Sequence, residues 1–162
     1  GVAAPVNIFW GKIGFGNNLF VAVGSGGTGN GVMTSPDGIT WTTRTPASDN
    51  VWVGVTFGNN VFVAVSFNGT GNRIMTSPDG ITWTSRTGPV ENTWSSITFG
   101  AGLFVIVGRS GTGNRIMTSP DGITWTVRTN PVDNDWRGVC FGNNTFVAVA
   151  ATGTGDRVMT SS

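Results

Sequence analysis

Short runs of alternating apolar and polar residues recur along the chain and predict β-strands. One such run, 94–100, reads Trp-Ser-Ser-Ile-Thr-Phe-Gly, and a dense apolar run follows at 103–107 after a short turn. Runs rich in Val, Ile, Thr, Phe and Trp, bounded by Gly, Pro, Asn or Asp, are typical of strands. Apolar residues nowhere recur with the 3.6-residue period of a helix, so the pattern predicts an all-β chain.

A repeat organises these strands. Trp10, Trp52, Trp94 and Trp136 lie 42 residues apart, with no insertion between them. In the second repeat the predicted strands are 52–58, 62–65, 73–77 and 81–87, and the other repeats follow the same pattern. We therefore expect a single repeat domain over residues 1–162, with repeats that start at the four tryptophans and an incomplete last repeat.

The connections between the strands favour antiparallel hairpins. Gly-Asn-Asn between the first two strands and Pro-Asp-Gly between the last two are short, and Asn and Gly supply the positive φ that tight turns need. Four antiparallel strands in 42 residues match one blade of a β-propeller, and such blades must stack to bury both apolar faces. We predict a propeller, with a β-solenoid or a β-trefoil-like barrel as the alternatives.

The two ends of the chain raise the question of ring closure. Residues 1–9 align with the linker between two repeats, and the last repeat stops at Ser162, before its fourth strand. The sequence thus predicts three full blades and one blade that lacks its outermost strand, with an open edge that invites self-association. Residues 1–9 or a neighbouring chain are the candidates to cover this edge. A four-bladed ring, a dimer forming an eight-bladed ring and a piece of a longer array all fit the sequence.

Composition and charge exclude some partners. Charged residues are 10% of the chain, the net charge is +1 and no Lys/Arg cluster occurs, so no nucleic-acid binding is predicted. The apolar run 103–107 is the longest and is far too short to span a bilayer. The chain starts at Gly1 without Met, which allows for a removed leader or tag. Cys140 is the single cysteine, and we expect it to be a buried, unreactive thiol.

Residues that most enzyme chemistry requires are missing. The chain has no His to act as a general base, and Glu91 is its only Glu. Glycosidases need two carboxylates with separated pKa values across one bond, whereas the acids here lie in turns and linkers. A zinc site of His and Cys ligands is excluded, and a calcium site at the Pro-Asp-Gly turns, which stays open, lacks the several carboxylates that such sites collect. We predict no catalysis, no cofactor and no bound metal.

The segment Ser35-Pro36-Asp37-Gly38-Ile39-Thr40-Trp41 resembles the Asp box of bacterial-neuraminidase-type repeats, and copies start at Ser77 and Ser119. The family pattern is S-x-D-x-G-x-T-W, so this chain is a variant with one residue fewer between Asp and Gly. Over essentially its whole length the chain is similar to non-catalytic Asp-box-like propeller repeats of bacterial surface and phage proteins.

This resemblance implies structural rather than catalytic roles. It implies that Asp37, Asp79 and Asp121 are turn residues that accept backbone N–H groups, and that the Trp of each box packs between strands. Sialidases with Asp boxes use a Tyr–Glu nucleophile pair and an arginine triad, and this chain has no Tyr. The resemblance also implies an extracellular or virion-surface location.

Comparison of the four repeats predicts a binding face. The two hairpin turns barely change between repeats, whereas the loop after the second strand and the linker after the fourth strand do, as at 67–69 and 46–50. In an antiparallel blade these variable connections emerge on the same side. Loops on a rigid scaffold usually carry binding function, so we expect the ligand on that side.

The same side should carry a polar and aromatic frame that recurs in each repeat. An aromatic ring beside guanidinium and amide donors suits a sugar or a small anionic group. A structural role is the alternative, with Trp packed on the neighbouring blade and Arg capping carbonyls or pairing with linker acids. The candidate ligand-binding residues are Trp10, Trp52, Trp94, Trp136, Arg44, Arg86, Arg128, Asn72, Arg73, Asn114, Arg115 and Arg157.

The sequence therefore predicts a non-catalytic, multivalent binding propeller, with lectin-like recognition of cell-surface glycans as its most specific form. The alternatives are a structural or assembly module of a phage virion or surface fibre, and a protein-binding propeller. A lectin predicts equal sites in every blade. A protein-binding ring predicts dominance by one or two divergent loops, and an assembly module predicts a fourth blade completed by another chain.

Overall fold

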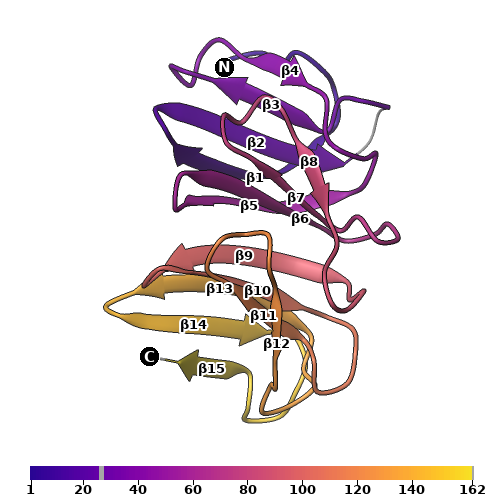
Figure 1. Ribbon diagram of the computed structural model, residues 1–162, viewed down its shortest axis with the longest axis vertical. Coiled ribbons are helices and arrows are strands. Elements are labelled where there is room, and N and C mark those ends of the chain that lie inside the picture. Colours follow the sequence, from indigo (N-terminus) through magenta and orange to yellow (C-terminus); the bar gives the residue numbers. More distant parts are fainter. Residues whose placement is uncertain (26–27, 162) are drawn as a thin grey trace.

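Four antiparallel sheets, one for each repeat, make up the computed structural model, which describes residues 1–25 and 28–161 (Figure 1). We call them blades 1 to 4. Blade 1 contains β1 (Phe9–Gly16), β2 (Leu19–Ser25), β3 (Val32–Ser35) and β4 (Thr42–Arg44). Blade 2 contains β5 (Trp52–Gly58), β6 (Val61–Ser66), β7 (Ile74–Ser77) and β8 (Thr84–Arg86). Blade 3 contains β9 (Trp94–Gly100), β10 (Leu103–Gly108), β11 (Ile116–Ser119) and β12 (Thr126–Arg128).

Blade 4 is the incomplete one, with only β13 (Trp136–Gly142), β14 (Thr145–Ala150) and β15 (Val158–Ser161). In every blade the strands follow chain order from the inner to the outer edge. The predicted all-β, propeller-type fold with three full blades and one three-stranded blade is therefore confirmed. The described part of the chain contains no apolar helix of membrane-spanning length.

The blades stack in sequence through their inner strands: β1 packs on β5, β5 on β9, and β9 on β13. Figure 1 shows blade 1 at one end of the molecule and blade 4 at the other, and the inner strands β1 and β13 are not among the packed pairs, so the four blades form an open arc. The N-terminal residues lie beside blade 1, at the opposite end of the arc from β15 (Figure 1). Within the described residues, the N-terminal segment therefore does not cover the open edge of blade 4.

Tight turns join the first two strands of each blade. Asn17 and Asn18 connect β1 to β2 with φ values of 48° and 56°, and the matching pairs in the other blades also have positive φ. Two successive residues with positive φ form the hairpin turn whose twist matches that of the flanking strands. Asn tolerates this conformation better than most residues, which explains the repeated Asn-Asn in the sequence.

The outer strands are shorter than the sequence predicts. The sequence predicts the fourth strand of blade 2 at 81–87, but β8 covers only Thr84–Arg86. The reason lies in the preceding turn, where the backbone N–H groups of Ile81 and Thr82 donate to the carboxylate of Asp79. Those groups are not available to pair with β7, so the strand begins only after Trp83.

Each hydrophobic core lies between two blades rather than inside one. The core between blades 1 and 2 combines Val21, Val23 and Val32 of blade 1 with Phe62 and Met75 of blade 2. A matching core lies between blades 2 and 3, and a smaller one between blades 3 and 4. Every blade is thus held by its neighbours, as expected for a repeat protein.

Cys140 corrects one expectation about this core. The sequence predicts a buried thiol, but Cys140 is exposed on β13. The reason is its position in the array, because no further blade packs on the free face of blade 4.

Candidate binding face

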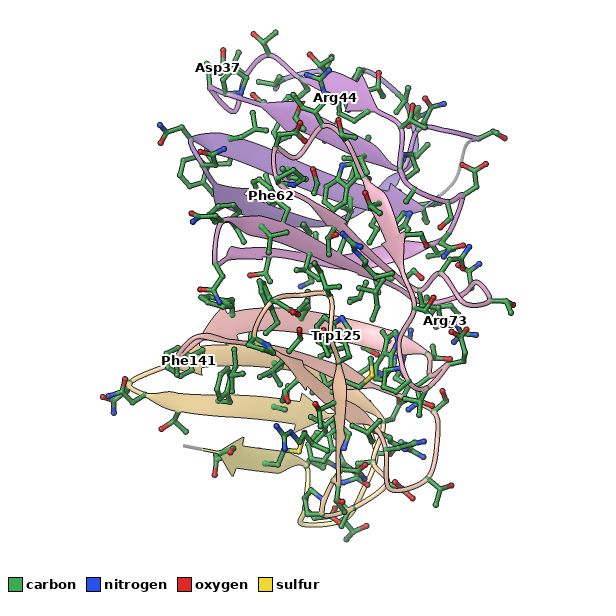
Figure 2. All side chains as sticks on the ribbon, viewed as in Figure 1. Asp37, Arg44, Phe62, Arg73, Trp125 and Phe141 are labelled. Atoms are coloured by element: carbon green, nitrogen blue, oxygen red, sulfur yellow. The ribbon has the colours of Figure 1, made fainter. Side chains whose placement is uncertain are left out.

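The connections between strands divide the molecule into two faces. The turn face carries the β1–β2 and β3–β4 turns and their counterparts, whereas the loop face carries the loops after the second strands and the linkers between blades. Figure 2 shows Asp37 of a turn on one side of the molecule and Arg73 of a loop on the other. Backbone hydrogen bonds join linker to loop on the loop face, for example from Phe67 N to Val51 O at 2.9 Å.

On the turn face, each Pro-Asp-Gly turn is organised by its aspartate. The carboxylate of Asp37 accepts hydrogen bonds from Thr40 N at 2.7 Å, Ile39 N at 2.8 Å and the Ser35 hydroxyl at 2.9 Å. These donors, led by the Thr40 N–H, lower the pKa of Asp37 to about 2. Asp79 and Asp121 make the same contacts.

The pKa values of the other two turn aspartates are also lowered. For Asp79 the main cause is the backbone N–H of Thr82. For Asp121 burial acts to raise the pKa, but the N–H groups of Thr124 and Ile123 outweigh it. In all three residues the turn donors bond to Oδ1, so each carboxylate holds the conformation of its own turn.

The four repeat tryptophans do not form an exposed aromatic platform. Trp52, Trp94 and Trp136 are fully buried between blades, and the indole N–H of Trp52 donates to Ser48 O at 3.1 Å. Trp10, on the end blade, is only partly buried. The prediction that these rings contact a ligand is therefore wrong for the three buried tryptophans, because each of them packs against the preceding blade.

The arginines at the ends of the outer strands form hydrogen bonds within their own blades. The Nε atoms of Arg44, Arg86 and Arg128 donate to Thr34, Thr76 and Thr118 on the neighbouring strand, at 3.0, 2.9 and 2.9 Å. Their backbones pair with Val32, Ile74 and Ile116, so Arg86 and Arg128 lie next to the Asn-Arg pairs. Their side chains, however, extend to the threonines two residues further along the strand. The structure thus does not bring these arginines together with the other candidates into one site.

The Asn-Arg pairs clamp the loops to the linkers. The side-chain amide of Asn92 donates to Asn114 O at 2.7 Å, and Arg115 Nε donates to Gly111 O at 2.8 Å. Arg115 also reaches the next linker, where its Nη1 donates to Asn134 O at 2.8 Å. The same contacts recur around the other members of the set, Asn72, Arg73 and Arg157, and Arg73 adds an ion pair with Glu91 at 3.2 Å.

A different group of residues on the loop face is not repeated, and we call it the arginine cluster: Phe67, Arg109, Asp135 and Arg137. Phe67 follows β6, Arg109 follows β10, and the other two flank Trp136 at the start of β13, so three blades contribute. The Arg109 guanidinium carbon lies 4.4 Å from the centroid of the Phe67 ring, and Arg137 Nη2 lies 2.6 Å from Asp135 Oδ2.

The arginine cluster is electrostatically unbalanced. Two guanidinium groups share one carboxylate, and burial followed by repulsion from Arg137 lowers the pKa of Arg109. The Nε atom of Arg109 and the Oδ1 atom of Asp135 are buried without a hydrogen-bond partner. An acidic group placed beside the Arg109 guanidinium would offset the repulsion from Arg137.

The sequence contained a signal for this cluster. At the position of Phe67 and Arg109 the other repeats have Ser25 and Ala151, and at the position of Arg137 they have Gly11, Val53 and Ser95. These positions lie in the segments of the loop face that vary between repeats. The candidate residues predicted from the sequence recur in each repeat, and in the structure these recurring residues maintain the scaffold.

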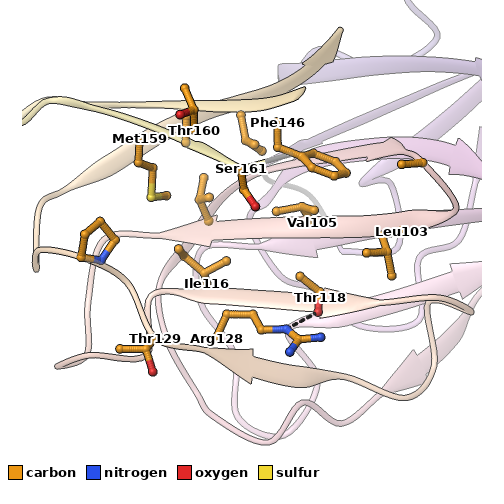
Figure 3. Close-up of a pocket in the computed structure, with 15 residues that line it drawn as sticks. Leu103, Val105, Ile116, Thr118, Arg128, Thr129, Phe146, Met159, Thr160 and Ser161 are labelled. Atoms are coloured by element: carbon orange, nitrogen blue, oxygen red, sulfur yellow. Dashed lines mark hydrogen bonds between the residues drawn. The ribbon is translucent and has the colours of Figure 1, made fainter. Parts of the chain in front are cut away.

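A cavity of about 550 Å³ lies between blades 3 and 4 (Figure 3). It is lined by apolar side chains that include Val105, Ile116, Phe146 and Met159, with Arg128 and its bond to Thr118 at the rim. The equivalent spaces in the other two interfaces are filled by the indoles of Trp83 and Trp125. The cavity exists because blade 4 contributes no outer strand and hence no such indole.

Among the described residues, no group of three or more His, Cys, Asp or Glu side chains is arranged to hold a metal ion. No protein-family model and no curated protein matches the sequence.

Solved structures do resemble the fold. A structure of YCF48 bound to D1 peptide is 21% identical over 92% of this chain and 49% of its own, with a TM-score of 0.69. The computationally designed Ika4 protein is 16% identical over 99% of this chain and 94% of its own, with a TM-score of 0.68. An inactive virginiamycin B lyase from Staphylococcus aureus with quinupristin is 18% identical over 92% and 51%, with a TM-score of 0.74. This chain spans about half the length of YCF48 and of the lyase, and these similarities establish the propeller-type fold alone.

Proposed function

We propose that this chain is a non-catalytic propeller module that binds an acidic segment of a protein partner at the arginine cluster on its loop face. The observation that carries the proposal is the contrast between repeated and non-repeated polar residues. The repeated Asn and Arg side chains are bonded within the scaffold, as Asn92 is to Asn114 and Arg115 is to Gly111. The non-repeated Arg109, by contrast, forms no ion pair with any described residue and lies near the second guanidinium of Arg137.

This contrast favours a protein partner over a glycan. Equal glycan sites in every blade would need exposed, repeated aromatic and polar groups, but three of the four repeat tryptophans are buried. A protein partner can instead be recognised by one group of divergent residues, and the arginine cluster is such a group. Absence of His and Tyr from the sequence supports a binding rather than a catalytic role.

The chemistry of the arginine cluster suits a carboxylate next to an apolar group. A guanidinium presents several donors in a fixed plane and pairs well with a carboxylate. Phe67 is partly exposed beneath Arg109, so its ring offers apolar contact area beside the charge. In a segment with an acidic side chain followed by an apolar one, the carboxylate would therefore pair with Arg109 and the apolar side chain would pack on Phe67.

Selection of a random displayed-peptide library on the immobilised protein tests this proposal. We expect enrichment of acidic peptides and, in titrations of the enriched peptides, binding about tenfold or more weaker for the Arg109→Ala variant. Arg44→Ala is the matched control, because it removes the same side chain at a position outside the arginine cluster. Arg44 ends the outer strand β4, where its Nε donates to Thr34. This control should bind as the unmodified protein does.

Two outcomes would overturn the proposal. Enriched peptides that bind equally well to the Arg109→Ala variant would remove the arginine cluster from the site. Selective binding to a glycan array, weakened equally by changes in any blade, would restore the lectin-like alternative.

The relationship of the repeats to Asp-box propellers is also a proposal. We infer that the Ser-Pro-Asp-Gly turns are a shortened Asp-box variant, which the hydrogen bonds from the Ile39 and Thr40 N–H groups to Asp37 support. An extracellular or virion-surface location, as in Asp-box proteins, stays a prediction.

A further inference from the structure

We propose that two copies of this chain join head to tail into one closed ring, with blade 4 of each copy packed on blade 1 of the other. The argument uses residues at the two free ends of the arc and is independent of the proposed peptide site. Its basis is that each end carries one half of the contacts that join neighbouring blades within the chain.

The main contact between neighbouring blades joins a phenylalanine to a glycine. Phe57 of blade 2 covers Gly16 of blade 1 so tightly that a Cβ on the glycine would lie 2.0 Å from the ring Cγ. The same relation joins Phe99 to Gly58 and Phe141 to Gly100. A glycine at this position is thus the acceptor for a ring from the next blade.

At the ends of the arc this contact is left half made. Gly142 of blade 4 occupies the acceptor position, and a Cβ there would meet nothing within 4 Å. Phe15 of blade 1 occupies the ring position and is 56% exposed. Phe15 of one copy therefore fits Gly142 of another through a contact that the chain already makes three times.

A second pair of residues supports the same joint. Between blades 2 and 3, a Cβ on Gly54 would lie 3.1 Å from Ile97 Cγ2, and Ile97 is only 8% exposed. Gly138 and Ile13 hold the corresponding positions at the two ends. Ile13 is 57% exposed, and the nearest atom to a Cβ on Gly138 belongs to its own blade.

The free face of blade 4 has the composition of a blade interface. Val149 is 48% exposed, although its counterparts Val23, Val65 and Val107 are completely buried by the following blade. Val158 is exposed as well, whereas its counterpart Val32 is buried. A monomer would leave both apolar end faces in water, and contiguous apolar patches of this kind usually mark an interface.

The ring is expected to contain two copies. Head-to-tail contacts form a ring when the repeated rotation closes, and propellers typically have four to eight blades. Blades 1 and 4 of one chain lie at opposite ends of the molecule (Figure 1), so a single copy does not close the ring. Two copies give eight blades, within that range, whereas three copies would give twelve.

Light scattering during size-exclusion chromatography of the 162-residue chain is the direct test. We expect a particle of twice the 16.8 kDa mass of the chain. Phe15→Lys and Gly142→Leu each damage both joints, and either should raise the concentration at which half of the particles dissociate by about thirtyfold or more.

Ile39→Lys is the matched control for the Phe15 variant. Ile39 is 64% exposed on blade 1, but its counterparts Ile81 and Ile123 stay 43% and 46% exposed inside the array. We therefore expect this variant to associate as the unmodified chain does. Circular dichroism of each variant shows whether loss of association occurs in a folded protein.

A mixture of the two damaged variants distinguishes this joint from other dimers. The Phe15→Lys copy keeps an intact blade 4, and the Gly142→Leu copy keeps an intact blade 1, so together they can form one undamaged joint. We expect the mixture to form heterodimers that neither variant forms alone. A dimer that joins like ends would show no such rescue, and that result would overturn the proposal.

The single cysteine offers an independent measurement. A Cβ on Gly14 would lie 3.5 Å from a Cγ atom of Val55 in the next blade, and Cys140 and Ile13 hold these two positions at the ends. An Ile13→Cys variant should therefore form a reducible covalent dimer through Cys140 under mild oxidation, and Ile39→Cys should not. A monomer mass for the unmodified chain together with no cross-link in Ile13→Cys would overturn the proposal.

Discussion

The ring of Phe57 lies directly over Gly16, where a methyl group on the glycine would be 2.0 Å from the ring Cγ. The two residues belong to consecutive blades, so this contact sets how closely the inner strands β1 and β5 approach. This contact recurs between each pair of neighbouring blades. A substitution at one of the enclosed glycines should therefore disturb the packing between two blades rather than the structure within one blade.

We expect Gly58→Ala to destabilise the fold. The new methyl group would lie 2.2 Å from Phe99 Cγ, in a core that is already filled, and overpacking of this kind costs about 1–3 kcal/mol. Urea unfolding followed by circular dichroism measures the change. Gly142→Ala is the control, since a methyl group on Gly142 would have no other atom of the chain within 4 Å. The free energy of unfolding of the monomeric Gly142→Ala variant should therefore not fall. Equal losses in both variants would show that the contact with the ring is not the cause.

Loss of an interblade indole should be costly only inside the array. Trp125 is buried in the core between blades 2 and 3, so Trp125→Ala should create a cavity like that between blades 3 and 4 and lower the free energy of unfolding by about 3–5 kcal/mol. Trp41 is the equivalent residue of the end blade and is only partly buried. Trp41→Ala should cost less than about 2 kcal/mol. Denaturant unfolding of both variants checks this, and similar losses would contradict the assignment of the core.

The turn aspartates should make stability depend on acid pH. The pKa of Asp37 falls from 3.8 to about 2 on folding, and those of Asp79 and Asp121 also fall. Because the folded-state pKa is the lower one, the charged carboxylates stabilise the fold above about pH 4, and this contribution is lost as the pH falls towards about 2.

The test is urea unfolding between pH 6 and pH 2 of the unmodified chain and of a variant with Asn at all three positions. The Asn oxygen can still accept the turn hydrogen bonds but does not titrate, so the variant should lose less stability with acid. An identical pH dependence of the two proteins would rule out the turns as its source.

Arg109 should matter more for binding than for stability. Its Nε atom is buried without a partner, so Arg109→Met, which keeps apolar contact with Phe67, should leave the free energy of unfolding unchanged or raise it by about 1 kcal/mol. The same variant should lose binding to the acidic peptides. Thermal unfolding and peptide titration measure the two effects, and a clear loss of stability would identify Arg109 as a scaffold residue.

Local chemistry explains why the strands and turns could be predicted from the sequence. Alternating apolar residues, the repeated tryptophans and the Asn-Asn and Pro-Asp-Gly turns act over a few residues, and they appear in the structure almost as expected. The outer strands are the exception, because the carboxylate of Asp79 takes the N–H groups of Ile81 and Thr82 before the strand can form.

The candidate site was harder to predict because a repeat has two explanations. Recurrence of Trp52, Trp94 and Trp136 fits repeated ligand sites as well as repeated packing, and only their burial between blades separates the two. The arginine cluster forms from single residues of three blades, and nothing in the sequence shows that Phe67 and Arg109 are in contact.

The sequence by itself determined the blade, since its period, its hydrophobic alternation and its turn residues are properties of consecutive residues. Only the tertiary structure decided which faces of the blades are covered. Burial depends on what packs from outside a repeat, and so Val107 is buried while its counterpart Val149 is exposed. For the same reason Cys140, expected in the core, lies on the open face of the last blade.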